Sequence, residues 1–284
     1  MDTLKIGLVQ GYWAQSQEAT KELYRSLVAD AAGQDATLIC LPEFTLAPYF
    51  PAKSEFDESG YQWAEPLQGG ISDAFFGELA KTHDVTIIGS LLEKTVDDYF
   101  DTATIHTPDV GMKYYTRKIH IPDGEGYHEA DYFKGSDEFP VHDMGFAKLA
   151  VPTCYDQWFP ELARIVALNG AEMIIYPSAI GSEPAAPDFS SRDAWQTVMR
   201  GHAVANGVFV AAINRVGVEH GIAFYGSSFV CDPLGNILAE ASDFKEEVIV
   251  VELDPSIQTQ YRQLFPLLKQ RRPNLYGRLI ANEG

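Results

Sequence analysis

Apolar stretches of strand length alternate with segments of helical periodicity along this chain, and the alternation runs through twice. Residues 4–10 have the composition of a buried strand, residues 19–31 place an apolar side chain at every fourth position, and residues 36–41 are apolar again. Strand, helix and strand in this order predict a parallel βαβ unit, so we expect an α/β protein.

The rest of the chain follows the same order. After a helical stretch at 71–83 and a strand at 85–93, a Pro-Asp-Val-Gly turn at 108–111 joins two strands, at 103–106 and 112–117, that should pair antiparallel. The second half predicts strands at 147–151, 173–177, 208–214, 227–231, 237–240 and 248–253, and helices at 160–169 and 193–206. Two pseudo-repeated βαβ halves predict two sheets packed face to face with helices outside, a four-layer αββα sandwich.

The chain has the size of one large domain. No Gly/Ser-rich linker or low-complexity tract divides its 284 residues, so we expect residues 1–284 to form a single domain. Residues 258–284 form a C-terminal extension rich in Arg and Pro, which we expect to lie at a subunit interface.

Charge and composition exclude several partners. The 21 basic and 40 acidic residues give a net charge of −19, which repels nucleic acids and anionic lipids and attracts cations. A solvated acidic surface that only aids solubility would carry the same charge. No apolar run approaches the roughly 18 residues that span a bilayer, and residues 1–6 lack the pattern of a secretory leader. We therefore expect no nucleic-acid partner, no membrane partner and a cytoplasmic location.

The sequence also lacks the patterns of metal and cofactor sites. Its three cysteines include no C-x-x-C pair, and His83 and His128, each followed by an acidic residue, have no ligand spacing around them. P-loop and dinucleotide-binding motifs are absent from the sequence. We predict no metal and no cofactor.

The first candidate for chemistry is Glu43, in the sequence Leu-Pro-Glu-Phe just beyond the carboxyl end of a predicted strand. Ligands of open α/β sheets bind at this edge, and a carboxyl group in an apolar shell can act as a base near neutral pH. Taken alone, the position is more typical of an exposed loop glutamate.

The second candidate is Lys118, in Arg-Lys-Ile-His-Ile-Pro-Asp-Gly at 117–124. Lys118 and His120 are two residues apart and would share a face if the strand ran through both. A fixed ammonium group stabilises a developing oxyanion, although a lysine on the surface fits the same pattern.

The third candidate is Cys154, which opens the sequence Cys-Tyr-Asp-Gln-Trp-Phe-Pro-Glu at 154–161. Pro160 suits the first turn of a helix and Glu161 its positive end, so backbone N–H groups near Cys154 should face a bound substrate. Cys40 and Cys231 lie in apolar strand runs, where a cysteine is usually a core residue. Cys154 is therefore the candidate nucleophile.

Together these three segments, in this order and spacing, resemble the carbon–nitrogen hydrolase (nitrilase) superfamily with its Glu-Lys-Cys triad. The resemblance covers residues 4 to about 276. Within the superfamily, the chain is most similar to amidases that act on a carbamoylated amine. That closer likeness rests on Ala-Ile-Gly-Ser-Glu-Pro at 179–184, Ser-Arg-Asp-Ala-Trp at 191–195, Asn-Arg-Val-Gly at 214–217 and Arg-Arg-Pro-Asn-Leu-Tyr at 271–276. The chain departs at Glu125, where a Gly-x-Gly loop of the family usually carries proline.

The resemblance implies a fold, an assembly and residue roles. The fold is the αββα sandwich of the nitrilase type, the assembly is a homo-oligomer, and the substrate is a small ureide or amide. Glu43 is expected to be the general base, Lys118 the oxyanion-stabilising cation, Cys154 the nucleophile and Glu129 the second glutamate that positions the lysine. The backbone N–H of Tyr155 is expected to be a further oxyanion donor.

Substrate choice is the most open part of this interpretation. A cationic amine tail needs a carboxylate in the far pocket, and Glu183 is the candidate. Tyr127, Trp158 and Ser178 are further candidate substrate-binding residues. An anionic tail would need a cation, which Arg192 could supply, so a ureido acid stays open beside aliphatic amides and nitriles.

Two further alternatives remain at this stage. One is a Cys-His pair in which His120 or His202 acts as the base. The other is a catalytically idle binding subunit, which the filled triad positions disfavour.

Overall fold

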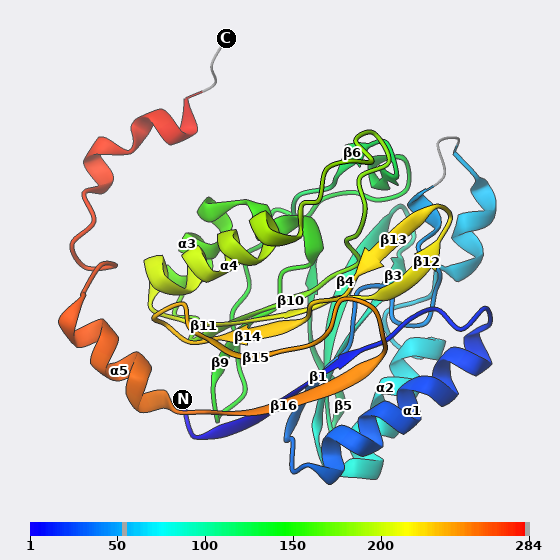
Figure 1. Cartoon of the computed structure of the whole chain (residues 1–284), viewed down its shortest axis with the longest axis horizontal. Coiled ribbons are helices and arrows are strands. Elements are labelled where there is room, and N and C mark those ends of the chain that lie inside the picture. The colour runs from blue at the N-terminus through cyan, green and yellow to red at the C-terminus, as the bar shows by residue number, and fades with distance from the viewer. Residues whose placement is uncertain (53–55, 282–284) are drawn as a thin grey trace.

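The computed structural model describes residues 1–52 and 56–281. In its first half, three parallel strands and two antiparallel ones form a sheet, and helices α1 and α2 lie along one face of it (Figure 1). The elements are β1 Leu4–Gln10, α1 Gln17–Gly33, β2 Leu38–Cys40, α2 Ile71–His83, β3 Thr86–Lys94, β4 Tyr99–Thr107 and β5 Gly111–Arg117. The strands and helices expected here are confirmed.

The second half repeats this plan. Parallel strands β9, β10 and β11 are flanked by antiparallel β8 and β14, and β15 follows at the edge, while helices α3 and α4 cover the outer face. The bounds are β8 His142–Asp143, β9 Lys148–Ala150, α3 Pro160–Leu168, β10 Met173–Pro177, α4 Arg192–Asn206, β11 Phe209–Ile213, β14 Phe229–Cys231 and β15 Ile237–Glu240.

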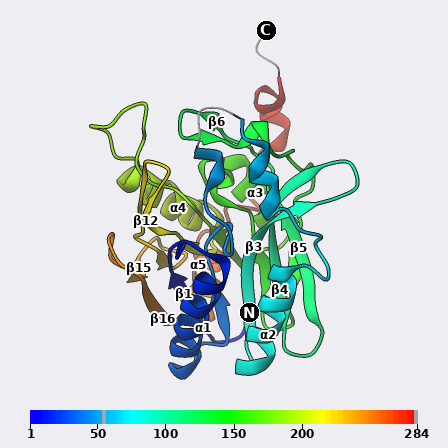
Figure 2. The same ribbon diagram turned by 90° about the vertical axis from the view of Figure 1, so that its right-hand side faces the viewer.

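Alternating side chains on the parallel strands create the layers. On β10, Met173 and Ile175 join the core between the two sheets, while Ile174 and Tyr176 pack against α3 and α4. The first sheet does the same: Leu38 faces the central core, whereas its neighbour Ile39 packs with residues of α1 and α2. Helix, sheet, sheet and helix therefore stack as four layers, which confirms the αββα sandwich (Figure 2).

The last strand departs from the simple two-half plan. β16 (Glu247–Leu253) belongs to the first sheet, where it pairs antiparallel with β1, so the chain crosses from the second sheet back to the first. The sequence predicted the strand and not this crossing, because pairing across more than 230 residues leaves no local pattern.

Several elements were not predicted. β12 (Val216–Glu219) and β13 (Ile222–Tyr225) form a separate hairpin, and β6 (Asp123–Gly124) pairs with β7 (Tyr127–His128) near the site described below. Helix α5 (Pro255–Leu264) occupies the start of the predicted extension. Short 3-10 helices lie at Phe50–Ala52, Glu58–Trp63, Glu129–Asp131, Cys154–Trp158, Pro273–Leu275 and Gly277–Ile280.

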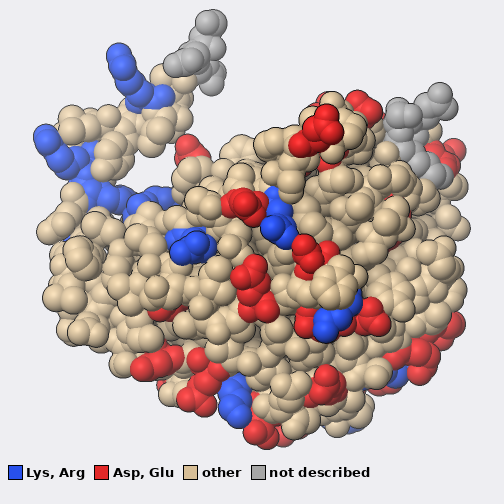
Figure 3. Space-filling view, in the orientation of Figure 1, with Lys and Arg blue, Asp and Glu red and all other residues tan. Residues whose placement is uncertain are grey.

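Beyond α5, residues 265–281 form an arm that projects from the body (Figure 1). Most of its apolar side chains are exposed, including Leu279 at 68% and Ile280 at 86%, while Leu268 is half-buried against the second half of the chain. Its charged residues are Lys269, Arg271, Arg272 and Arg278, and Figure 3 shows basic side chains gathered on this arm while acidic ones spread over the body. Within the described residues, no helix combines the length and apolar composition needed to cross a membrane.

Candidate active site

Cys154 follows β9 and begins a 3-10 helix, Cys154–Trp158. Its backbone has φ +41°, a left-handed conformation that residues other than glycine rarely adopt. Thr153 and Asp156 form a capping box that holds the turn, and Asp156 also accepts hydrogen bonds from the backbone N–H groups of Ile119 and His120. The turn is thereby tied to the segment that follows β5. Backbone strain held in place by neighbours is typical of functional sites.

Glu43 lies on the loop after β2, with its side chain fully buried. Ser90 on β3 anchors this loop, because its hydroxyl accepts a hydrogen bond from Phe44 N and its backbone N–H donates to Thr45 Oγ1. Phe44 has φ +47°, so the chain turns sharply just after the glutamate. The expectation of an exposed loop residue is excluded for Glu43.

Lys118 comes directly after the last residue of β5 and is also fully buried. Its ammonium donates to Glu43 Oε1 at 2.8 Å and to Glu129 Oε2 at 2.6 Å, and Asp101 Oδ2 lies 3.4 Å away. The idea that Lys118 shares a strand face with His120 is wrong, because the strand ends at Arg117. The His120 ring instead bonds Asp156 and stacks on Phe159.

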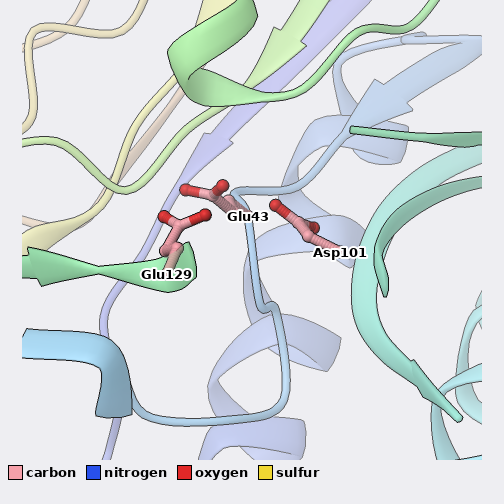
Figure 4. A group of neighbouring side chains, drawn as sticks. All are labelled: Glu43, Asp101 and Glu129. Atoms are coloured by element: carbon pink, nitrogen blue, oxygen red, sulfur yellow. The ribbon is translucent and has the colours of Figure 1, made fainter. Parts of the chain in front are cut away.

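Three buried carboxyl groups, which Figure 4 shows as neighbours, lie within 3.4 Å of this ammonium. Glu43, Asp101 and Glu129 each offer an oxygen within 4.8 Å of the others. Among the described residues, this is the one group of acidic, histidine or cysteine side chains that lie close enough together to hold a metal ion. The ammonium of Lys118 bonds two of them and lies beside the third. The cluster therefore has its own cation.

Burial and charge shift the proton affinities in this cluster. Burial opposes the charge on Lys118, but Glu129 and Glu43 outweigh it and raise the lysine pKa well above its ordinary value. Burial raises the pKa of Glu129 to about 7. Burial and then the charge of Glu43 raise the pKa of the Cys154 thiol. The resting cysteine is therefore a thiol that needs a base in order to attack.

A cavity of about 530 Å³ opens beside Cys154. It is lined by Tyr127, Tyr155, Trp158 and Glu183, together with Pro122, Asp123, Gly124, Glu125, Glu129, Ile180, Ala185, Phe189, Ser191 and Ala194. Its walls are largely apolar, and no lysine or arginine is among the lining residues of the described chain. The size and lining suit a small molecule.

Two candidate residues lie away from this cavity. Ser178 is fully buried and its hydroxyl donates to Gln157 Oε1, so the expectation that it binds substrate is corrected. Arg192 is exposed, bonds Asp243 at 2.8 Å and does not line the cavity. The cation that an anionic substrate tail would need is therefore not supplied by Arg192.

The alternative Cys-His pair finds no support in the geometry. His202 Nε2 is bonded to the backbone oxygen of Gln157, and His120 is held by Asp156. The charged groups that shift the pKa of Cys154 are Glu43, Lys118 and Glu129, and neither histidine is one of them.

Arg215 is a structural support that the sequence interpretation missed. This fully buried arginine donates to the backbone oxygens of Glu43, Phe44 and Ala47 and to Glu219 Oε1. It thereby clamps the loop that carries Glu43. The Asn-Arg-Val-Gly sequence was noted for its resemblance alone, because the backbone oxygens that Arg215 binds lie about 170 residues away in the sequence.

Tyr49 is the second such residue. Its backbone N–H donates to Glu219, and its hydroxyl donates to Glu129 Oε1 at 2.7 Å. Together with Lys118, it satisfies both oxygens of Glu129 and fixes that carboxyl group. Asp101 was missed as well, since nothing in the sequence links it to Lys118.

A four-layer αββα sandwich with a buried cysteine, lysine and two glutamates beside one small-molecule cavity defines an enzyme that hydrolyses carbon–nitrogen bonds. The chain belongs to the carbon-nitrogen hydrolase family, whose model matches residues 5–263, and this confirms the resemblance to the nitrilase superfamily.

Relatives and solved structures agree with this assignment. The chain is 40% identical to N-carbamoylputrescine amidase of Arabidopsis thaliana over 91% of its length and 89% of the relative's. It is 35% identical to the citrullinase of Francisella tularensis over 99% of both chains. A carbon-nitrogen hydrolase from Helicobacter pylori superposes with a TM-score of 0.92 at 37% identity, covering 99% of each chain.

Proposed function

We propose that this enzyme hydrolyses a small ureide whose far end is a cationic amine, with N-carbamoylputrescine as the substrate and putrescine, carbon dioxide and ammonia as products. The observation that carries the proposal is the charge of the cavity. Asp123, Glu125 and Glu183 line it, and within the described residues none of the three is in an ion pair. An ammonium tail would gain a partner there, whereas a carboxylate tail would meet repulsion.

The identities of the relatives support the same reaction. Enzymes named for N-carbamoylputrescine recur among them, from Arabidopsis thaliana, rice, tomato and potato at 37–40% identity. Citrulline is also a ureide, but it ends in an amino acid whose carboxylate would lie near these acids. The structure therefore favours the diamine derivative over citrulline and over ureido acids.

In the proposed first step, the thiol of Cys154 gives its proton to Glu43 and the sulfur attacks the ureide carbon. Lys118 and the backbone N–H of Tyr155 stabilise the oxyanion. Glu43 then gives the proton to the leaving nitrogen, so the carbon–nitrogen bond breaks and a thioester-like intermediate stays on Cys154. Glu129 holds Lys118 in place throughout.

In the second step, Glu43 takes a proton from water, and the resulting hydroxide attacks the intermediate. The carbon–sulfur bond breaks and Cys154 regains its proton. The released carbamate decomposes to carbon dioxide and the second amine. Water is the co-reactant, and the raised pKa of the Cys154 thiol explains why a base must take its proton in the first step and why Glu43 returns a proton to the departing sulfur in the second.

We also propose that the arm at 265–281 docks on a second copy of the chain. Its four cations and absence of acidic residues complement a chain of net charge −19, and its exposed leucine and isoleucine side chains offer apolar contact area.

The substrate is tested by ammonia release from N-carbamoylputrescine, citrulline, N-carbamoyl-β-alanine and the uncharged N-butylurea. We expect the highest kcat/KM for N-carbamoylputrescine. Glu183→Gln should raise its KM about tenfold, the effect of losing about 1.4 kcal/mol, and leave that of N-butylurea unchanged. Asp188→Asn, on the same loop outside the cavity, is the matched control. Equal effects of Glu183→Gln on both substrates, or a preference for citrulline, would overturn the assignment of the cationic tail.

A further inference from the structure

Asp101 is a buried acid at the candidate active site to which no role has been assigned. It lies on β4, its side chain is fully buried, and its backbone oxygen accepts a hydrogen bond from Lys118 N at 2.9 Å. Oδ1 accepts a hydrogen bond from the hydroxyl of Ser90 at 3.0 Å. The same serine hydroxyl accepts from Phe44 N, so Asp101 belongs to the framework that holds both Glu43 and Lys118.

Two carboxyl oxygens in this cluster have no hydrogen-bond partner among the described residues. They are Asp101 Oδ2 and Glu43 Oε2, and both are inaccessible to solvent. Buried oxygens of this kind are costly unless a proton joins them. In Figure 4 the carboxyl group of Asp101 points toward Glu43, and each residue offers an oxygen within 4.8 Å of the other.

The net charge of the cluster also indicates that one of its carboxyl groups holds a proton. One ammonium, that of Lys118, faces three carboxyl groups, and full ionisation would leave two net negative charges in a buried volume. A proton on one carboxyl group halves that excess. Glu129 has both oxygens occupied by the donors Lys118 and Tyr49, which suits an anion. Asp101 accepts one neutral hydroxyl, and its other oxygen lies 3.4 Å from the Lys118 ammonium and accepts no hydrogen bond among the described residues.

We propose that Asp101 is a positioning residue of this site that keeps its proton and donates it in a hydrogen bond to Glu43. The inference rests on the proposed function, because it assigns the partner of the proposed base. It gives Glu43 a fixed orientation toward Cys154. It also leaves the third N–H of Lys118 available for the oxyanion, since an ionised Asp101 at 3.4 Å would compete for that donor.

The surroundings of Asp101 support this protonation state. Burial and the nearby charge of Glu43 raise the pKa of Asp101 well above its ordinary value, and Lys118 only partly offsets them. The charged groups facing it are Glu43, Lys118 and Glu129. On the neighbouring strands, Glu93 and Arg117 pair with each other, and Glu93 bonds the next residue of β4, Thr102, whose side chain points to the opposite face.

The test measures alkylation of Cys154 by iodoacetamide from pH 5 to 9, followed by intact mass, which does not depend on knowing the substrate. Asp101→Asn keeps the shape and a neutral donor and cannot ionise, so its rates should stay within about threefold of the unmodified enzyme at every pH. Asp101→Ala removes the donor. We expect it to react about tenfold more slowly below pH 7, with a profile moved about one pH unit upward, because the base then holds its own proton more readily.

The outcomes separate the possibilities. An Asp101→Asn enzyme whose profile shifts as far as that of Asp101→Ala would show that the ionised carboxylate is needed, and an unchanged Asp101→Ala enzyme would show no role; either overturns the proposal. If Asp101→Ala does not fold, the infrared difference between the unmodified enzyme and Asp101→Asn at pH 7 decides, since a protonated carboxyl C=O band is expected and a carboxylate band contradicts it. Failure to hydrolyse ureides, with these results intact, would refute the proposed substrate alone.

Discussion

Replacing Lys118 by methionine removes the ammonium from the centre of the cluster while keeping most of the side-chain volume. Two hydrogen bonds, of 2.8 Å to Glu43 and 2.6 Å to Glu129, are lost, and the carboxyl groups are left without their buried cation. The proposed reaction also loses one donor to its oxyanion. Loss of one such donor lowers kcat by about 10² to 10³.

The same substitution should lower stability in a pH-dependent way. Removing one partner of a buried ion pair costs about 3–5 kcal/mol. Burial raises the pKa of Glu129 from 4.5 to about 7, so the folded chain binds this proton more strongly than the unfolded chain does. The stability that protonated Glu129 contributes to the fold is therefore lost as pH rises from about 4.5 to 7. Lys118 lowers the pKa of Glu129, so without this lysine the loss of stability continues to higher pH. Lys118→Met should therefore be destabilised more at pH 8 than at pH 5.

The assays are steady-state ammonia release and urea unfolding at both pH values. Lys134→Ala is the matched control, because this lysine is 69% exposed and pairs with Asp98 at the surface. The control should keep its rate and stability. A folded Lys118→Met enzyme with kcat within threefold of the unmodified enzyme would refute the role given to the ammonium, and equal destabilisation at pH 5 and pH 8 would refute the charge argument.

Three further predictions follow from other contacts. Arg215→Ala should lower the free energy of unfolding by about 3–5 kcal/mol in urea, against less than about 1 kcal/mol for Lys5→Ala, which removes a partly exposed ion pair with Asp35. Similar losses would contradict the buried clamp. Tyr49→Phe should lower kcat about tenfold with an unchanged circular dichroism spectrum, since Glu129 loses one of its donors; an unchanged kcat would count against this support. Deleting the chain from Phe265 onward should reduce the number of subunits per particle, obtained from light scattering with the subunit mass corrected for the deletion; an unchanged number of subunits would remove the arm from the interface.

The sequence predicts this fold well where the signals are local. Alternation of strand and helix along residues 4–41 and 147–213 is visible in the side-chain pattern, and the structure has the corresponding elements. The hairpin of β12 and β13 was missed because its two-residue turn is formed by His220 and Gly221, both with positive φ, and a histidine rarely takes that conformation.

The site was only partly predictable for a related reason. Glu43, Lys118 and Cys154 each follow a strand end and carry a recognisable neighbourhood, so sequence alone singled them out. Asp101 and Arg215 act on them through contacts between distant segments, such as the 172 residues that separate Arg215 from Glu43. Ser178 failed as a substrate contact because the residue after a buried strand can turn inward and bond a neighbouring side chain.

The central claim is that Cys154, and no other thiol of this chain, carries the hydrolysis. It is tested most directly by ammonia release from N-carbamoylputrescine by three single variants. Cys154→Ala should be inactive, while Cys40→Ala and Cys231→Ala, which change buried core cysteines on β2 and β14, should keep turnover near that of the unmodified enzyme. A folded Cys154→Ala enzyme that still releases ammonia at the normal rate would contradict the account.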